Sequence, residues 1–264
     1  MAHAKKLRPI VGVTGTSTAR GVPIPSRVNR GVDRFLSVQR PVVLAHLRGI
    51  RRTYPDASPD DVAYLVGRRY LLAVTASGAA VGATAVIPAV GTITTLALSA
   101  VETAAFLEAT ALFAQSIAEV HGLPVSDPER ARALVLALML GKEGSALVAQ
   151  WGLEVTESEV SRELYWRKVV SSSIPRLVVG PLVEKLQSAF ARRLATSGSA
   201  SILAKAIPFG VGAVVGGAGN RITGSRVVHA ANLMFGALPE TFPESLTLPR
   251  PPAPSDGRPG AQPR

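Results

Sequence analysis

The side chains that most often carry out catalysis or bind metals are few in this chain and lie far apart. Its four histidines are His3, His46, His121 and His229, and no two of them have the HxxxH or HExxH spacing of a helical zinc site. Cysteine is absent, which excludes a thiol nucleophile, a Cys-based zinc site and a disulfide scaffold. The sequence therefore predicts no metal site and no cofactor.

The acidic residues are equally poor candidates for catalysis. Glu108 and Glu119 share one face of a predicted helix but are separated by about 16 Å along its axis, too far for a catalytic carboxylate pair. Glu102 lies about 120° around the helix from Glu108. A GxxxxGK[ST] phosphate loop and a GxSxG nucleophile elbow are both absent. No pattern favours an enzyme, and we expect these acids to be helix-surface groups or partners of arginines.

Net charge is the first property that bears on function. The 264 residues carry a formal charge of +11, and residues 1–55 account for 11 basic side chains against one acid, which gives 11 − 1 = +10. Such an arm is compatible with a solvated terminus, an anionic membrane surface or nucleic acid, and its few aromatic residues make nucleic acid the least favoured partner. We expect the following side chains to contact an anionic surface: Lys5, Lys6, Arg8, Arg48, Arg51, Arg52, Arg68 and Arg69.

A long uncharged stretch follows this basic region. Residues 70–101 hold no charged side chain, and Pro88 and Gly91 divide the stretch into two predicted helices joined by a turn. The first is long enough to approach the thickness of a bilayer core. Its Ala, Gly, Ser and Thr content lowers the gain from entering lipid, and Glu102 follows directly. Spanning a membrane, shallow entry and burial in a helical core all remain open.

A second glycine-rich segment, residues 206–220, is too short to cross a bilayer. It repeats the GxxxG spacing of Gly78 and Gly82, which permits close approach of two helix backbones, and we expect it to pack against that pair. The residues expected to form the helix packing or the membrane hairpin are Gly78, Gly82, Pro88, Gly91, Glu102, Pro208, Gly212, Gly216, Gly217 and Asn220.

Helix signals dominate the rest of the chain, so the predicted fold class is all-α, a multi-helix bundle around the apolar hairpin. Ser58 and Pro59 predict a helix start, and His121 and Gly122 predict a stop. Further starts are expected at 126–129, at 156–159, and after Pro175 and Pro208. We expect a basic flexible arm at 1–25, one helical domain at 26–237, and a disordered Pro-rich tail at 238–264.

The glycine and proline pattern resembles that of the EcsC family of bacterial proteins over roughly residues 58–236. The resemblance rests on Ile87-Pro88-Ala89-Val90-Gly91, the long helix with Glu102 and its His121-Gly122 stop, and the pattern Ile207-Pro208, Gly212-Ala213, Gly216-Gly217 and Asn220 that continues to Ala230 and Phe235. It implies an all-helical, membrane-associated bacterial protein whose biochemical activity is not established, and it implies no active-site residues.

The function expected from these features is a non-enzymatic accessory role at a membrane: structural, regulatory or transport-associated. Its expected location is the cytoplasmic side of the cytoplasmic membrane, with an anionic lipid surface as partner and a protein partner also open. The alternative is a soluble cytoplasmic helical module that binds a lipid or another apolar ligand in an Ala/Gly-lined core.

Overall fold

The computed structural model describes residues 38–84, 92–156, 176–204 and 211–247. Within these ranges it contains α-helices, one short 3-10 helix and no strand, which confirms the all-α prediction. The elements are α2 (Arg40–Thr53), α3 (Pro59–Thr84), α4 (Thr92–Val120), α5 (Pro128–Leu140), α6 (Lys142–Thr156), α8 (Arg176–Ala204), α9 (Val211–Phe235) and η1 (Glu244–Leu246).

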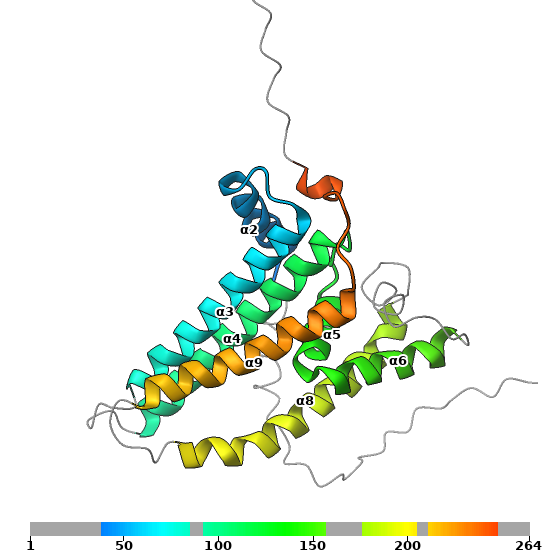
Figure 1. Cartoon of the computed structure of the whole chain (residues 1–264). Coiled ribbons are helices and arrows are strands. Elements are labelled where there is room, and N and C mark those ends of the chain that lie inside the picture. The colour runs from blue at the N-terminus through cyan, green and yellow to red at the C-terminus, as the bar shows by residue number, and fades with distance from the viewer. Residues whose placement is uncertain (1–37, 85–91, 157–175, 205–210, 248–264) are drawn as a thin grey trace, which may run out of the picture.

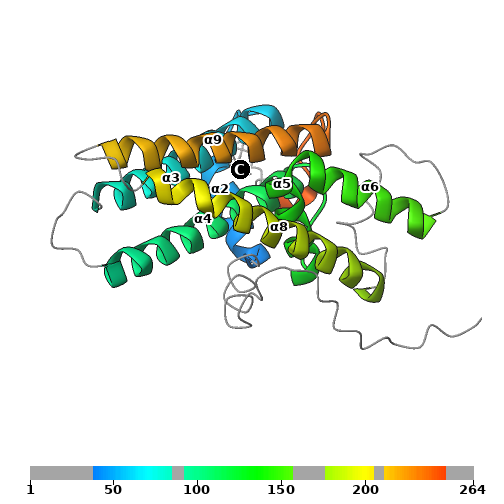
Figure 2. The ribbon, with the colours of Figure 1, turned by 90° about the horizontal axis from the view of Figure 1, so that it is seen from below.

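Two groups of helices make up the fold. The long helices α3, α4 and α9 run side by side, and the α3–α9 pair makes the most extensive contact among the described elements (Figures 1 and 2). The second group consists of α5, α6 and α8, which pack on one another and meet the first group through α5. Helix α2 and η1 lie together at the upper end of Figure 1, next to the carboxyl end of α4.

The helix ends follow local capping chemistry that the sequence predicted. Before α3, the backbone N–H and the hydroxyl of Ser58 both donate to the Asp61 carboxylate, and the Asp61 N–H donates back to the Ser58 hydroxyl. Before α5, the Asp127 carboxylate accepts from the Glu129 N–H at 2.9 Å. Helix α4 ends at Val120, and Gly122 follows at a φ of 72° that glycine adopts without strain.

The corner between α5 and α6 was not predicted from the sequence. Gly141, at a φ of 63°, ends α5, and α6 begins at the next residue. Gly144 in the first turn of α6 lies directly on the backbone of Ala137, where a Cβ has no room. Thr156 is the last residue of α6, whereas the sequence indicated that it starts a helix; residues 157–175 lie outside the described ranges.

The core is built from aliphatic side chains centred on α5. Leu134, Leu136 and Leu138 on successive sides of α5 are all buried, because α4, α6, α8 and α9 surround this helix. Leu47 of α2 and Leu182 of α8 are also fully buried and belong to the same cluster. Each such side chain contributes about 1.5–3 kcal/mol through removal from water. This core holds one end of α3, α4 and α9 in place.

The predicted boundary of the Pro-rich tail at residue 238 is wrong for its first ten residues. Residues 238–247 continue from the carboxyl end of α9 to α2, and Leu246 of η1 is fully buried against α2 (Figure 1). Phe242 and Leu238 are half-buried against the same core. These apolar side chains, spaced along a segment rich in proline, supply the burial that the composition of the tail concealed. Residues 248–264 lie outside the described ranges.

Candidate functional site

Helices α3 and α9 cross antiparallel at backbone contact. A Cβ added to Gly78 would lie 2.5 Å from the carbonyl oxygen of Gly216, and a Cβ added to Gly216 would overlap the carbonyl oxygen of Gly78. A Cβ added to Gly217 would make a tight but less severe contact, 3.2 Å from the carbonyl oxygen of Thr75. Gly82 borders the same contact, with its Cα 3.6 Å from a Cβ at Gly216. The glycines therefore set how closely the two helices approach.

Helix α4 joins α3 and α9 near Gly78 through a polar contact. The side-chain amide of Asn220 on α9 donates to the Glu102 carboxylate on α4 at 3.1 Å, and the same amide lies against Gly78 of α3. About two turns before Gly78 on α3, the hydroxyl of Tyr70 lies 3.0 Å from the hydroxyl of Thr110 on α4. The first contact marks a boundary, because beyond Glu102 and Asn220 these three helices hold no charged residue.

The uncharged segments of the three helices form what we call the charge-free end: residues 70–84 of α3, 92–101 of α4 and 211–220 of α9. On α3, residues 70–74 lie beside Gly224, on the other side of the Glu102–Asn220 contact. Figure 1 shows the three ends gathered at the lower left, and Figure 2 shows them together again from below. On α4 and α9, the ten uncharged residues rise about 15 Å, roughly half the ~30 Å hydrocarbon core of a bilayer. The nearest charge before α9 in the chain is Lys205, outside the described residues.

Large apolar side chains point outward from the charge-free end. Leu72 is 56% exposed, Val101 67% and Val214 70%, and Val215 and nearby Ile222 are exposed as well. Tyr70 and Val74 of α3 point inward and are buried. The hairpin therefore has an inner face that packs in the bundle and an outer face of aliphatic side chains with no described partner.

Three hydroxyl groups on α3 and α9 are bonded within their own helices. The Thr75 hydroxyl donates to the Leu71 carbonyl at 2.6 Å, and the Ser77 hydroxyl donates to the Val74 carbonyl at 3.0 Å. On α9, the Thr223 hydroxyl donates to a carbonyl one turn earlier in the same way. Such internal bonds remove the need for water around a polar side chain.

Basic and aromatic side chains border the charge-free end. Arg68 and Arg69 of α3 and Arg221 of α9 are exposed. Arg68 and Arg221 line a cleft of about 680 Å³ between α3 and α9, together with Tyr64, which is 69% exposed, and Leu72. Arginine and tyrosine beside an apolar surface are the residues that accumulate at the headgroup level of membranes.

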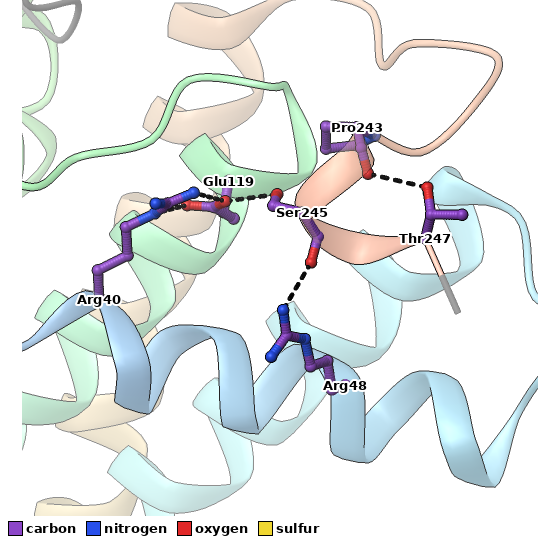
Figure 3. A network of polar contacts seen from close by, with 6 residues as sticks. All are labelled: Arg40, Arg48, Glu119, Pro243, Ser245 and Thr247. Atoms are coloured by element: carbon purple, nitrogen blue, oxygen red, sulfur yellow. Dashed lines mark hydrogen bonds and ion pairs between the residues drawn. The ribbon is translucent and has the colours of Figure 1, made fainter. Parts of the chain in front are cut away.

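The opposite end of the bundle contains a second polar cluster, drawn in Figure 3. The Arg40 guanidinium of α2 donates to both oxygens of the Glu119 carboxylate on α4, at 2.8 and 3.0 Å, and the Ser245 hydroxyl donates to the same carboxylate at 2.7 Å. The Glu119 side chain is only 3% exposed. Hydrogen bonding to Glu119 raises the pKa of Arg40 above its ordinary value. The cluster ties α2, α4 and η1 together.

Three arginines expected to contact an anionic surface also belong to this end: Arg48, Arg51 and Arg52 of α2. Arg51 is buried, which lowers its pKa; it donates to the Leu246 carbonyl and its guanidinium carbon lies 3.9 Å from the centre of the Phe242 ring. The assignment of Arg51 to an anionic surface is therefore wrong, because its guanidinium binds Phe242 and Leu246 in the segment after α9. Arg48 is exposed and donates to the Ser245 carbonyl at 3.2 Å, and Arg52 is exposed.

Helix α2 and the charge-free end are far apart. Glu119, to which α2 is bonded, lies 119 − 92 = 27 residues from the start of α4, a rise of about 40 Å. Arg48 and Arg52 therefore cannot contact a membrane surface that the charge-free end meets end-on. Arg68, Arg69 and Arg221 are the basic residues next to it.

Several expected site residues lie outside the described ranges: Lys5, Lys6, Arg8, Pro88, Gly91 and Pro208. Gly212 is in the first turn of α9. The described ranges contain no cluster of three potential metal ligands from His, Cys, Asp and Glu. In the same ranges, no helix has the length and apolar character needed to cross a bilayer.

The chain matches no protein-family model, and the comparison with curated proteins and solved structures found no similar protein. The resemblance to EcsC proteins therefore stays a prediction. The Arg40–Glu119–Ser245 cluster was not predicted from the sequence. Arg40 is 79 residues and Ser245 is 126 residues from Glu119, so no local spacing connects them.

Proposed function

We propose that this protein is a membrane-associated accessory protein, without enzymatic activity, that inserts its charge-free end into one leaflet of an anionic membrane. The observation that carries the proposal is the outward aliphatic surface of Val101 and Val214 on helix segments without charge. Exposed Leu72 and Arg221 lie next to it, on the other side of the Glu102–Asn220 contact. Each aliphatic side chain that leaves water contributes about 1–2 kcal/mol, and each bordering arginine near anionic headgroups about 1 kcal/mol. The role remains structural, regulatory or transport-associated.

The internal polar contacts support the same proposal. Entry of helix ends into hydrocarbon is costly when polar groups lose water without another partner. Here the hydroxyls of Thr75 and Ser77 are bonded to their own helix, and Glu102 is bonded to Asn220 at the edge of the charge-free end. The depth of about 15 Å fits entry into one leaflet of a cytoplasmic membrane.

Flotation of the full chain with vesicles tests the proposal. We expect binding to vesicles of phosphatidylglycerol and phosphatidylcholine, and at least tenfold weaker binding for V101D/V214D, because the two new carboxylates would enter the apolar layer. The matched control is V42D/L153D, which places the same charges at residues of similar exposure on α2 and α6. Equal loss in both variants, or no loss in V101D/V214D, would contradict insertion through this end.

A further variant measures how much the arginines beside the charge-free end contribute to vesicle binding. R68Q/R221Q keeps the aliphatic surface and removes two charges next to it. At about 1 kcal/mol per arginine, binding to anionic vesicles should fall roughly 30-fold, and binding to purely zwitterionic vesicles should hardly change. Equal effects on both vesicle types would count against an anionic leaflet. Wild-type protein that floats with neither type would favour a protein partner on this surface.

A further inference from the structure

A second cleft, on the other side of α9, has a composition that points to a ligand. It has a volume of about 830 Å³ and lies between the α5–α6 corner, α8 and α9. Sites for small molecules and lipids commonly have volumes of 300–1,000 Å³. Unlike the cleft between α3 and α9, which contains Asp60, this one has only basic, hydroxyl and apolar side chains among the described residues that line it.

Four basic side chains from three different elements converge on this cleft. They are Lys142 at the start of α6, Arg193 of α8, and Arg226 and His229 of α9. The Arg193 guanidinium is held in place because it donates to the Leu140 carbonyl at 3.1 Å, at the carboxyl end of α5. Several cations around one cavity favour an anionic group within it.

Apart from Ser145 and Ser225, the rest of the wall is apolar. Leu138, Leu140 and Ala230 form its buried part, and Ala146 and the half-exposed Leu233 extend it toward solvent. A small inorganic anion would leave this apolar wall unused, and a purely apolar ligand would leave the cations without a partner. The lining is therefore complementary to a molecule that carries an anionic head and an alkyl chain.

The position of the cleft relative to the charge-free end identifies the source of such a molecule. Ser225 and Arg226 line the cleft and follow Asn220, the last residue of the charge-free end on α9, by five and six residues. The separation along the helix axis is about 8 Å, roughly the depth of a headgroup layer above the hydrocarbon. We infer that this cleft binds an anionic lipid, with its headgroup among Lys142, Arg193, Arg226 and His229 and its chain along Leu138 and Leu233. That the lipid comes from the bilayer rests on the proposed function.

Binding of dodecyl phosphate, kept below its micelle concentration, tests the cleft without any membrane. Isothermal titration calorimetry of the full chain should give at least tenfold weaker binding for K142Q/R226Q than for wild type. The matched control R52Q/R192Q removes two exposed charges away from the cleft and should bind like wild type. A146W, which places a large ring in the apolar wall, should also weaken binding at least tenfold. Equal affinity of K142Q/R226Q and the control would overturn the assignment.

Three comparisons separate the possible ligands and the two proposals. Inorganic phosphate should bind at least tenfold more weakly than dodecyl phosphate, and equal affinity would overturn the alkyl-chain part of the site. V101D/V214D should keep its affinity for dodecyl phosphate even if it loses vesicle binding, because these residues lie outside the cleft. If A146W floats with vesicles like wild type but no longer binds dodecyl phosphate, membrane entry and lipid binding are separate events. Loss of dodecyl phosphate binding in V101D/V214D would contradict the placement of the site.

Discussion

Replacement of Gly216 by alanine gives a sharp test of the α3–α9 contact, because Gly219 in the same helix provides a control for the identical change. A Cβ at Gly216 would overlap the carbonyl oxygen of Gly78 and lie 3.2 Å from its carbonyl carbon, so the two backbones must separate. At Gly219, no described atom lies within 4 Å of an added Cβ.

The expected magnitudes follow from these distances. In a helix interior, alanine is favoured over glycine by about 1 kcal/mol, and this gain applies to both positions. Overpacking against backbone, which cannot rotate away, costs about 3 kcal/mol at Gly216. G216A should therefore lower the free energy of unfolding by about 2 kcal/mol and G219A should raise it by about 1 kcal/mol. The difference between the two variants is the measured quantity, since it cancels the propensity term.

Urea unfolding followed by far-UV circular dichroism measures this difference. Equal slopes of the two transitions with urea would show that the same surface is exposed in each variant, so that their midpoints can be compared. The reasoning would be refuted if G216A were as stable as G219A, because the two helices would then tolerate separation at no cost.

Three other predictions concern α2 and η1, at the opposite end of the bundle. R40M should lower the free energy of unfolding, measured in urea, by about 2 kcal/mol, because it leaves the buried Glu119 carboxylate without its cationic partner. The double variant R40M/E119M should recover part of that loss. L246A should cost about 2–4 kcal/mol in the same assay because Leu246 is fully buried, whereas T247A at the adjacent exposed position should cost little. Burial, aided by the charge of Arg69, lowers the pKa of His46, so the folded state disfavours its protonation. Stability should therefore fall as the pH drops below about 6.5, where the unfolded histidine gains a proton, and H46Q should show a flatter profile in unfolding measured between about pH 7.5 and 5.

Local signals accounted for most helix boundaries. Ser58 with Asp61, and Gly122 at positive φ, act through neighbouring residues, so the sequence was sufficient to place those ends. The α5–α6 corner was not predicted because apolar residues continue on both sides of Gly141, so no clear signal in the sequence marks that one helix ends there and another begins. Leu246 was missed for a different reason: its burial depends on α2, almost 200 residues earlier, and the prolines around it dominated the composition.

The candidate site, too, could be predicted from the sequence only in part. Absence of charge is a property of each segment, so the stretch 70–101 and its glycine-rich counterpart could be recognised from the sequence. Which side chains face outward could not, because the outward position of Val101 and the inward position of Tyr70 are decided by three helices at once. The cleft with Lys142, Arg193 and Arg226 was likewise invisible, since it joins residues from α6, α8 and α9 whose spacing carries no pattern.

The contact between Gly78 and Gly216 has a consequence for synthesis of the chain. The two glycines are 216 − 78 = 138 residues apart, and translation at roughly 5–20 residues per second separates their appearance by about 7–28 s. During that interval the α3–α4 hairpin leaves the ribosome with the groove for α9 uncovered. The surface of α3 that α9 will cover, around Gly78, is therefore exposed until α9 has been synthesised.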